Sequence, residues 1–281
     1  MTEVLIDTLL DALKMLPFLF GAYLAIEFVE HKISEKAIAR LSQFGRSGSF
    51  IGALFGVIPQ CGFSVMAANL YSNRIITAGT LIAVFISTSD EAIPVLLSDP
   101  QSAGKIFPLI LSKFLIALIA GTVIDISGIF KTSKADADAV IEEHSHCHAE
   151  EHGGILKSAI HHTTETFVFL IIVMLALNTA IYFIGEETLG KFLMGGSVLQ
   201  PLFAGIVGLI PNCAASVVIA QLYAQNAISF GSAIAGLSAG SGMGLLLLFR
   251  TDIDKAECLK IAATLFSVSV LTGITVQFLV G

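Results

Sequence analysis

The sequence predicts an all-α polytopic membrane protein built from two four-segment repeats, and two observations lead to this. Hydrophobic residues make up 55% of the chain and charged residues only 13%, against roughly 25% charged residues in soluble domains. In addition, residues 56–71 (GVIPQCGFSVMAANLY) return without a gap as 208–223 (GLIPNCAASVVIAQLY), 152 residues later. Matching interruptions in two halves of a membrane chain are typical of transport proteins.

The hydropathy pattern gives eight hydrophobic segments, most of them about 20 residues long, as a bilayer core of roughly 30 Å requires. They are 17–29, 50–71, 75–97 and 106–130, followed by 167–184, 198–223, 228–249 and 261–280. We therefore expect a first transmembrane repeat at 1–132, a linker rich in acid and histidine at 133–158, and a second repeat at 159–281. The most basic short stretch, 31–47, is expected in the cytoplasm by the positive-inside rule.

Each copy of the repeat places a proline, an amide and a thiol in the middle of an apolar run. In hydrocarbon, an unpaired polar group costs several kcal/mol unless protein, water or a substrate satisfies it. We expect broken or re-entrant helices with these P-[QN]-C triplets at their tips; the alternative is two proline-kinked helices whose small residues serve only close packing. The candidate substrate-binding residues are Pro59, Gln60, Cys61, Ser64, Asn69, Pro211, Asn212, Cys213, Ser216, Gln221, Asp90 and Glu91.

The orientation of the two halves depends on these broken elements. If they cross the membrane fully, the halves are parallel; if they are re-entrant hairpins, the halves are inverted. The inverted arrangement is favoured because an arm such as 50–58 reaches only about 13 Å, roughly half of the bilayer core. The two tips would then meet near the midplane, where inverted-repeat transporters bind their substrates.

Asp90 and Glu91 interrupt the apolar run of the third segment, within residues 87–91 (STSDE). Ionisable groups inside membrane segments are costly and point to function, although the same residues also fit a helix N-terminus at the membrane surface. The equivalent stretch of the second half, 239–244 (AGSGMG), keeps the interruption and lacks the charges. The two acids are therefore not needed for the fold.

The linker carries histidines at alternating positions among glutamates, a composition typical of metal binding. Its candidate ligands are His144, His146, His148 and His152; the alternative is a solvated acidic linker. The cysteines form no zinc-ribbon or redox pair, and we expect free thiols. Thiols suit copper(I), zinc or trivalent arsenic, whereas carboxylate and amide oxygens suit harder ions such as manganese. The candidate metal ligands within the membrane are Asp90, Glu91, Cys61 and Cys213.

The duplicated P-[QN]-C triplets, the eight-segment pattern and the histidine-rich linker resemble the permease superfamily of arsenical and heavy-metal exporters, and most of all its branch of arsenic efflux proteins and manganese transporters. The resemblance implies a multi-pass inner-membrane exporter of a metal or metalloid ion. Other branches carry more cysteine around the same prolines, whereas this chain has one per triplet. This difference leaves room for a harder cation.

From these features we expect a secondary-active transporter that exports a divalent transition metal of the manganese or zinc type. The alternatives are an arsenite or organoarsenical permease and, more remotely, a membrane-embedded thiol enzyme, for which the chain lacks a Cys-x-x-Cys pair and a nucleophile–base set. No catalytic residue, resident cofactor or nucleic-acid partner is expected; the partners are the lipid bilayer and the ion. The oligomeric state stays open, a homodimer included.

Overall fold

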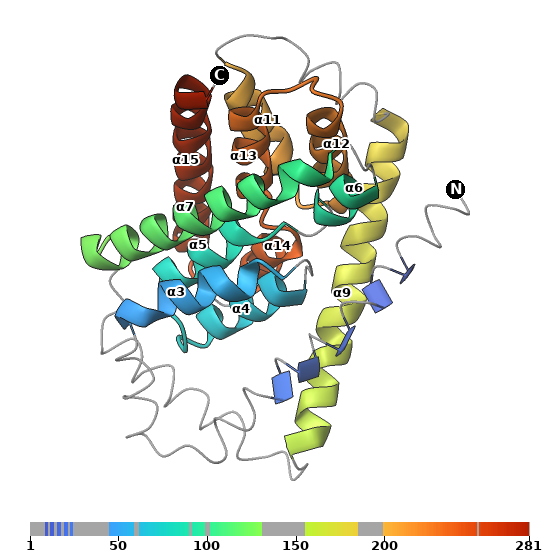
Figure 1. Ribbon diagram of the computed structural model, residues 1–281. Coiled ribbons are helices and arrows are strands. Elements are labelled where there is room, and N and C mark those ends of the chain that lie inside the picture. Colours follow the sequence, from blue (N-terminus) through green and yellow to red (C-terminus); the bar gives the residue numbers. More distant parts are fainter. Residues whose placement is uncertain are drawn as a thin grey trace.

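The computed structural model describes residues 45–58, 62–89, 92–98, 102–130, 155–184, 199–251 and 253–280, together with part of 9–24 (Figure 1). Within these residues every regular element is a helix and there is no β-strand, which confirms the predicted all-α class. The helices that follow the first segment are α3 (Gly45–Gly56), α4 (Gly62–Ser72), α5 (Ala78–Ser87), α6 (Ala92–Ser98), the short 3-10 turn η2 (Ala103–Lys105) and α7 (Ile106–Ser127). The later ones are α9 (Ile155–Ile184), α11 (Gln200–Gly208), α12 (Cys213–Ala224), α13 (Phe230–Ala239), α14 (Met243–Arg250) and α15 (Lys255–Val280).

Four helical stretches in the described part of the chain are long and apolar enough to cross a membrane. They are Ala78–Leu97, Ala103–Ser127, Phe230–Arg250 and Lys255–Leu279. The second of these exposes large apolar side chains along one side, among them Phe107, Ile119 and Ile126. In water such a stripe would be unfavourable, whereas in a bilayer it faces the lipid tails.

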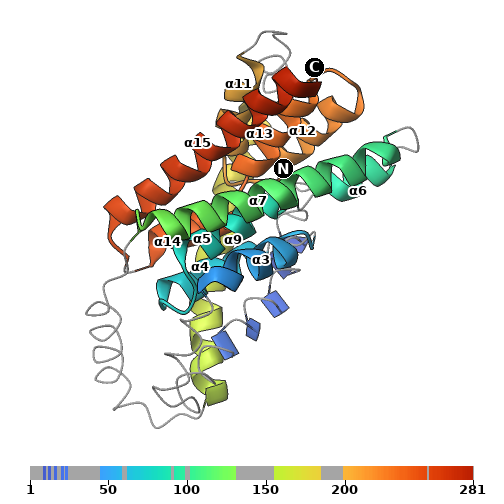
Figure 2. The same ribbon diagram turned by 60° about the vertical axis from the view of Figure 1, so that its left-hand side comes forward.

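Two helices form the centre of the molecule. All ten residues of α5 are buried, and in α13 every residue after Phe230 is buried. Helix α5 packs between α3 and α7, and α13 packs between α11 and α15. We call helices α3 to α7 the first set and α11 to α15 the second set. Figure 2 shows the first set, in blue to green, lying beside the second set, in orange to red. Central helices that are apolar on all sides are typical of a membrane bundle.

Glycines allow the central helices to approach their neighbours closely, at positions that correspond between the two sets. A Cβ on Gly79 of α5 would lie 2.2 Å from the carbonyl oxygen of Gly121 in α7. In the second set, a Cβ on Gly231 of α13 would lie 2.3 Å from the carbonyl oxygen of Gly273 in α15. Only residues without a side chain permit this spacing, as is common between membrane helices.

The turns that follow α4 and α12 also correspond. Arg74 and Asn226, which stand 152 residues apart, both adopt a left-handed backbone, with φ of 55° and 58°. The residue after each donates its backbone N–H to a carbonyl oxygen five residues earlier, at 2.9 and 2.8 Å. This pattern is the Schellman motif, which satisfies carbonyls at a helix end.

The short helices α4 and α12 pack across the two sets. Helix α4 of the first set packs against α14 of the second, and α12 of the second packs against α6 of the first. Each set therefore packs one short helix against the other, and the central helices α5 and α13 also contact each other.

Candidate functional site

The two central helices both stop inside the protein. Helix α5 ends at Ser87 and α13 ends at Ala239, and the next helices begin only at Ala92 and Met243. The interruption expected at 239–244 thus lies at 240–242, where Gly242 has a left-handed φ of 55°. A helix end leaves carbonyl groups without intrahelical partners, and buried in the protein they must be satisfied by other groups.

Hydroxyl groups satisfy part of the end of α5. Ser87 donates to the carbonyl oxygen of Ala83 at 2.8 Å, and Thr88 donates to that of Val84 at 2.7 Å. The side chains of Ser87, Thr88 and Ser89 are all buried. The acidic residues that follow, Asp90 and Glu91, are outside the described residues, so their predicted role stays a prediction.

A lysine connects the ends of the two central helices. Lys113 of α7 is fully buried, and its ammonium donates to the carbonyl oxygen of Thr88 and, at 2.7 Å, to that of Leu237 in the last turn of α13. Our sequence interpretation missed this residue, because 106–130 looked like an ordinary span. One signal was present: a single basic residue in the middle of an apolar segment is costly and points to function.

The predicted serines lie close to the interruption between α13 and α14. A Cβ on Gly240 would lie 3.6 Å from Ser216 Oγ, and a Cβ on Gly244 would lie 2.5 Å from the backbone oxygen of Ser64. Ser64 is fully buried and Ser216 is half-buried. Ser216 Oγ thus lies beside the break itself, whereas the backbone of Ser64 lies against the first turn of α14 that follows it.

The second P-[QN]-C triplet lies between two helices. Helix α11 ends at Gly208 and α12 begins at Cys213, so Pro211 and Asn212 are the last two residues of the connection. Asn212 is buried and caps α12: its side-chain oxygen accepts from the N–H of Ala214 at 2.8 Å. This is the usual role of asparagine before a helix.

Several other predicted residues lie outside the described part of the chain. The first triplet, Pro59, Gln60 and Cys61, is not among the described residues, and the same holds for the side chain of Cys213.

The two amides that match across the repeat have different surroundings. Asn69 of α4 is buried, and its Nδ2 has no hydrogen-bond partner in the described part of the protein. Gln221 of α12 is exposed. An unpaired buried amide costs free energy, so Asn69 is a better candidate than Gln221 for a residue whose partner is a ligand or water.

Asp125 holds the start of α5. Its carboxylate accepts hydrogen bonds from Ser49 at 3.1 Å, from Thr77 at 2.9 Å and from the backbone N–H of Gly79 at 2.9 Å. A carboxylate at a helix N-terminus is stabilised by the unpaired N–H groups there. Gln277, 152 residues later, takes the equivalent place beside Ser229 at the start of α13. Because an amide suffices there, we interpret Asp125 as a residue that holds the helices together.

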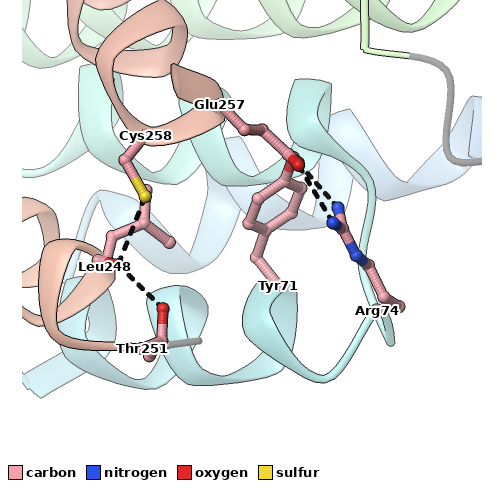
Figure 3. A network of polar contacts seen from close by, with 6 residues as sticks. All are labelled: Tyr71, Arg74, Leu248, Thr251, Glu257 and Cys258. Carbon is pink, nitrogen blue, oxygen red and sulfur yellow. Dashed lines mark hydrogen bonds and ion pairs between the residues drawn. The ribbon is translucent and has the colours of Figure 1, made fainter. Parts of the chain in front are cut away.

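A charged cluster ties α4 to the first turn of α15, and we call it the first clamp (Figure 3). The Arg74 guanidinium donates to the two carboxylate oxygens of Glu257 at 2.6 and 2.9 Å, and the hydroxyl of Tyr71 donates to the same carboxylate. The hydrogen bonds to Glu257 raise the pKa of Arg74, partly offset by burial. The guanidinium also lies 5.4 Å from the ring centroid of Tyr71, within the range of a cation–π contact.

The second clamp, between η2 and the end of α12, has the same layout with different chemistry. Lys105, 152 residues before Glu257, donates to the carbonyl oxygens of Tyr223 and Ala224 at 3.0 and 2.9 Å and to the side chain of Asn226 at 2.7 Å. Its ammonium lies 5.0 Å from the ring centroid of Tyr223. The two clamps therefore join equivalent positions, with the acid of one replaced by a base in the other.

Metal-binding groups do not gather in the described part of the protein. No cluster of three or more histidine, cysteine, aspartate or glutamate side chains occurs among these residues. The candidate ligands His144, His146, His148 and His152 fall outside them. Cys258 is described; it is a buried free thiol that donates to the carbonyl oxygen of Leu248 at 3.3 Å (Figure 3).

Comparison with known proteins identifies the family. No curated protein and no solved structure matches the chain. One family model does: it covers residues 1–188 and 174–280, and its description reads "Putative, 10TM heavy-metal exporter". The match spans nearly the whole sequence and agrees with the apolar helices of the fold. The chain is therefore a multi-pass membrane protein that belongs to this family of heavy-metal exporters.

Proposed function

We propose that the protein is a secondary-active transporter that exports a divalent transition metal ion of the manganese or zinc type. The observation that carries the proposal is the pair of buried helix interruptions, after Ser87 and after Ala239, in a member of a heavy-metal exporter family. Helix ends at membrane depth supply carbonyl and amide groups that can bind an ion, and transporters commonly place their sites at such ends.

The architecture that we propose is a pair of inverted repeats, 1–132 and 159–281, joined by a linker at 133–158. Three observations support it. The α4–α14 packing has its counterpart in the α12–α6 packing, as expected when two halves are related by a two-fold axis. Figure 2 shows α7 running from right to left and α15 from left to right. The family description gives ten spans, two more than the eight segments that hydropathy predicted. Divided equally they would be five crossings per half, an odd number that inverts the second half.

We place the proposed site between the helix interruptions and the P-[QN]-C triplets. Two described residues support this location: Ser216 Oγ lies near Gly240 in the break between α13 and α14, and the backbone of Ser64 lies against Gly244 in the first turn of α14. Asn69, whose Nδ2 has no partner among the described residues, is a further candidate ligand on α4. Asp90 and Glu91 would supply the charge. Two carboxylates balance a divalent cation, and oxygen ligands suit manganese.

The alternative cargo is arsenite or an organoarsenical. It rests on Cys61 and Cys213, because thiolates bind trivalent arsenic, and it needs no acidic pair since arsenous acid is neutral. One thiol per triplet is few for a site of thiolates alone. For this reason we favour the divalent ion.

The proposed setting is a bacterial-type inner membrane, with coupling to protons or to the membrane potential. The sequence contains no phosphate-binding loop that would indicate ATP hydrolysis. His144, His146, His148 and His152 would collect metal ions near the entrance without shaping the translocation site.

Growth of a deletion strain tests the proposal. Cells without the gene are grown in manganese, zinc, arsenite and methylarsenite, and cellular metal is measured by mass spectrometry. We expect sensitivity to manganese or zinc, with accumulation of that metal, and recovery on expression of the intact chain but not of the variant with Asp90→Asn and Glu91→Gln. Sensitivity to arsenicals alone would contradict the divalent-ion assignment and support the alternative.

A further inference from the structure

Lys113 is the charged residue at the centre of the described fold, and the transport proposal does not use it. It is fully buried although it belongs to α7, a helix that exposes Leu111, Leu115 and Ile119 to its surroundings. Its neighbours one turn away, Leu109 and Ala117, are also fully buried. Lys113 therefore lies on the inner side of a span whose other side faces lipid.

Its two carbonyl partners belong to different halves of the chain. The carbonyl of Thr88 stands at the end of α5, and that of Leu237 lies in the last turn of α13. The C-terminal end of a helix carries about half a negative charge. Two such ends therefore offset part of the charge of one buried ammonium.

The fold by itself does not require a charge here. The equivalent position of the second half, 152 residues later, is Leu265, which is also fully buried. The α13–α15 contact thus forms with an apolar residue at this position. A single lysine serves both helix ends, so its charge acts at the junction of the halves.

The chemistry of this junction is that of a cation site. In transporters with interrupted helices, helix C-termini and unwound carbonyls commonly bind the sodium ion that drives transport. An ammonium offers the same charge and hydrogen bonds in place of coordination. It differs in being fixed to the chain, so it cannot be carried across the membrane.

We propose that the Lys113 ammonium is a tethered cation that takes the place of a sodium ion between the ends of α5 and α13. Lys113 is then a positioning residue for the transport site: its charge holds the two interrupted helices together, and transport needs no sodium ion. The inference rests on the proposed transport function and adds the role of one residue to it.

Vesicles containing the purified full-length protein provide the test. Manganese uptake by the wild type should be the same within about twofold in sodium, potassium or choline buffer. Lys113→Ala should lower uptake on the order of tenfold or more, because two buried helix ends lose their cation. Propylamine, which replaces the three carbons and the nitrogen removed, should restore uptake, whereas 1-propanol should not. Wild-type vesicles with the same amine correct for its effect on pH gradients.

Two further variants separate charge from packing. Leu265→Ala is the matched control, since it removes a buried side chain at the equivalent position, and its uptake should not respond to propylamine. Lys113→Met keeps the length of the chain without the charge and should be inactive. Wild-type uptake that requires sodium, full activity of Lys113→Met, or equal rescue by propanol would each overturn the proposal.

A transport-independent measurement keeps the two proposals distinguishable. If wild-type vesicles move neither manganese, zinc nor arsenite, the proposed function fails by itself. Thermal unfolding of Lys113→Ala in detergent then tests the tethered cation: propylamine should raise the unfolding temperature of this variant and not that of Leu265→Ala. If propanol raised the unfolding temperature of Lys113→Ala as much as propylamine does, the lysine would only fill space, and the inference would be refuted.

Discussion

Glu257→Gln should weaken the first clamp between α4 and α15. The carboxylate accepts two hydrogen bonds from Arg74, at 2.6 and 2.9 Å, and one from Tyr71. Glutamine keeps the size of the side chain but offers one acceptor oxygen in place of two and carries no charge. The Arg74 guanidinium then stays in the same place with a neutral partner.

The loss can be estimated from the burial of the pair. The side chains of Arg74 and Glu257 are 18% and 23% exposed. Exposed ion pairs contribute about 0–1 kcal/mol, and breaking a buried one costs about 3–5 kcal/mol. For a largely buried two-pronged pair we expect about 1–3 kcal/mol. At roughly 2–4 °C per kcal/mol, the unfolding temperature should fall by about 2–12 °C.

Thermal unfolding of the purified protein in detergent measures this effect, and a double-mutant cycle with Arg74→Gln isolates the pair. We expect a coupling energy of about 1 kcal/mol or more, whereas Lys157→Gln on the exposed surface of α9 should change stability by less than about 0.5 kcal/mol. If the stability losses of the two single variants add up to the loss of the double variant within about 0.5 kcal/mol, Arg74 and Glu257 are not coupled, and the reasoning is refuted.

Three further predictions concern other parts of the chain. Gly231→Ala should destabilise the protein by about 1–3 kcal/mol, because the new Cβ would meet the backbone oxygen of Gly273 at 2.3 Å, whereas Gly104→Ala, with open space around it, should have little effect in the same unfolding assay. Asp125→Asn should keep both stability and transport, because the equivalent position of the second half holds the amide Gln277. Asp125→Leu should lower the free energy of unfolding by about 1–3 kcal/mol through three lost hydrogen bonds. Equal losses of stability for the two changes would show that the charge itself is needed. Deleting 142–152 should lower the apparent metal affinity and leave transport measurable, and complete loss of uptake by a correctly inserted deletion protein would count against the collecting role.

Hydropathy and the internal repeat predicted the features that follow from local sequence. The all-α class follows from the apolar runs, and the family is confirmed by the match over 1–188 and 174–280. The interruption at 240–242 was predictable because three glycines in residues 240–244 disfavour a continuous helix.

The features that sequence missed depend on contacts between distant residues. Lys113 bonds to backbone carbonyls of Thr88 and Leu237, and no side-chain pattern marks a carbonyl as a partner. The two clamps were hidden for a related reason: Glu257 and Lys105 occupy equivalent positions but have opposite charges, so the repeat does not show them as a match.

Burial was also not predictable from the repeat. Asn69 and Gln221 are both amides in apolar runs and stand 152 residues apart, at equivalent positions of the repeat, yet Asn69 is buried and Gln221 is exposed. Periodicity assigns a residue to a helix, but which neighbour covers it depends on packing between the halves. Here α4 lies against α14 whereas α12 lies against the shorter α6.

The most direct test of the divalent-ion assignment is uptake of manganese and of arsenite by vesicles containing two double mutants. Asp90→Asn with Glu91→Gln removes the proposed counter-charge and keeps size and hydrogen bonding, whereas Cys61→Ser with Cys213→Ser removes the thiols. We predict that the first pair abolishes manganese uptake and that the second reduces it less, with both proteins correctly inserted. A transporter that depends on the cysteine pair and tolerates the loss of the acidic pair would contradict the assignment and identify an arsenical permease.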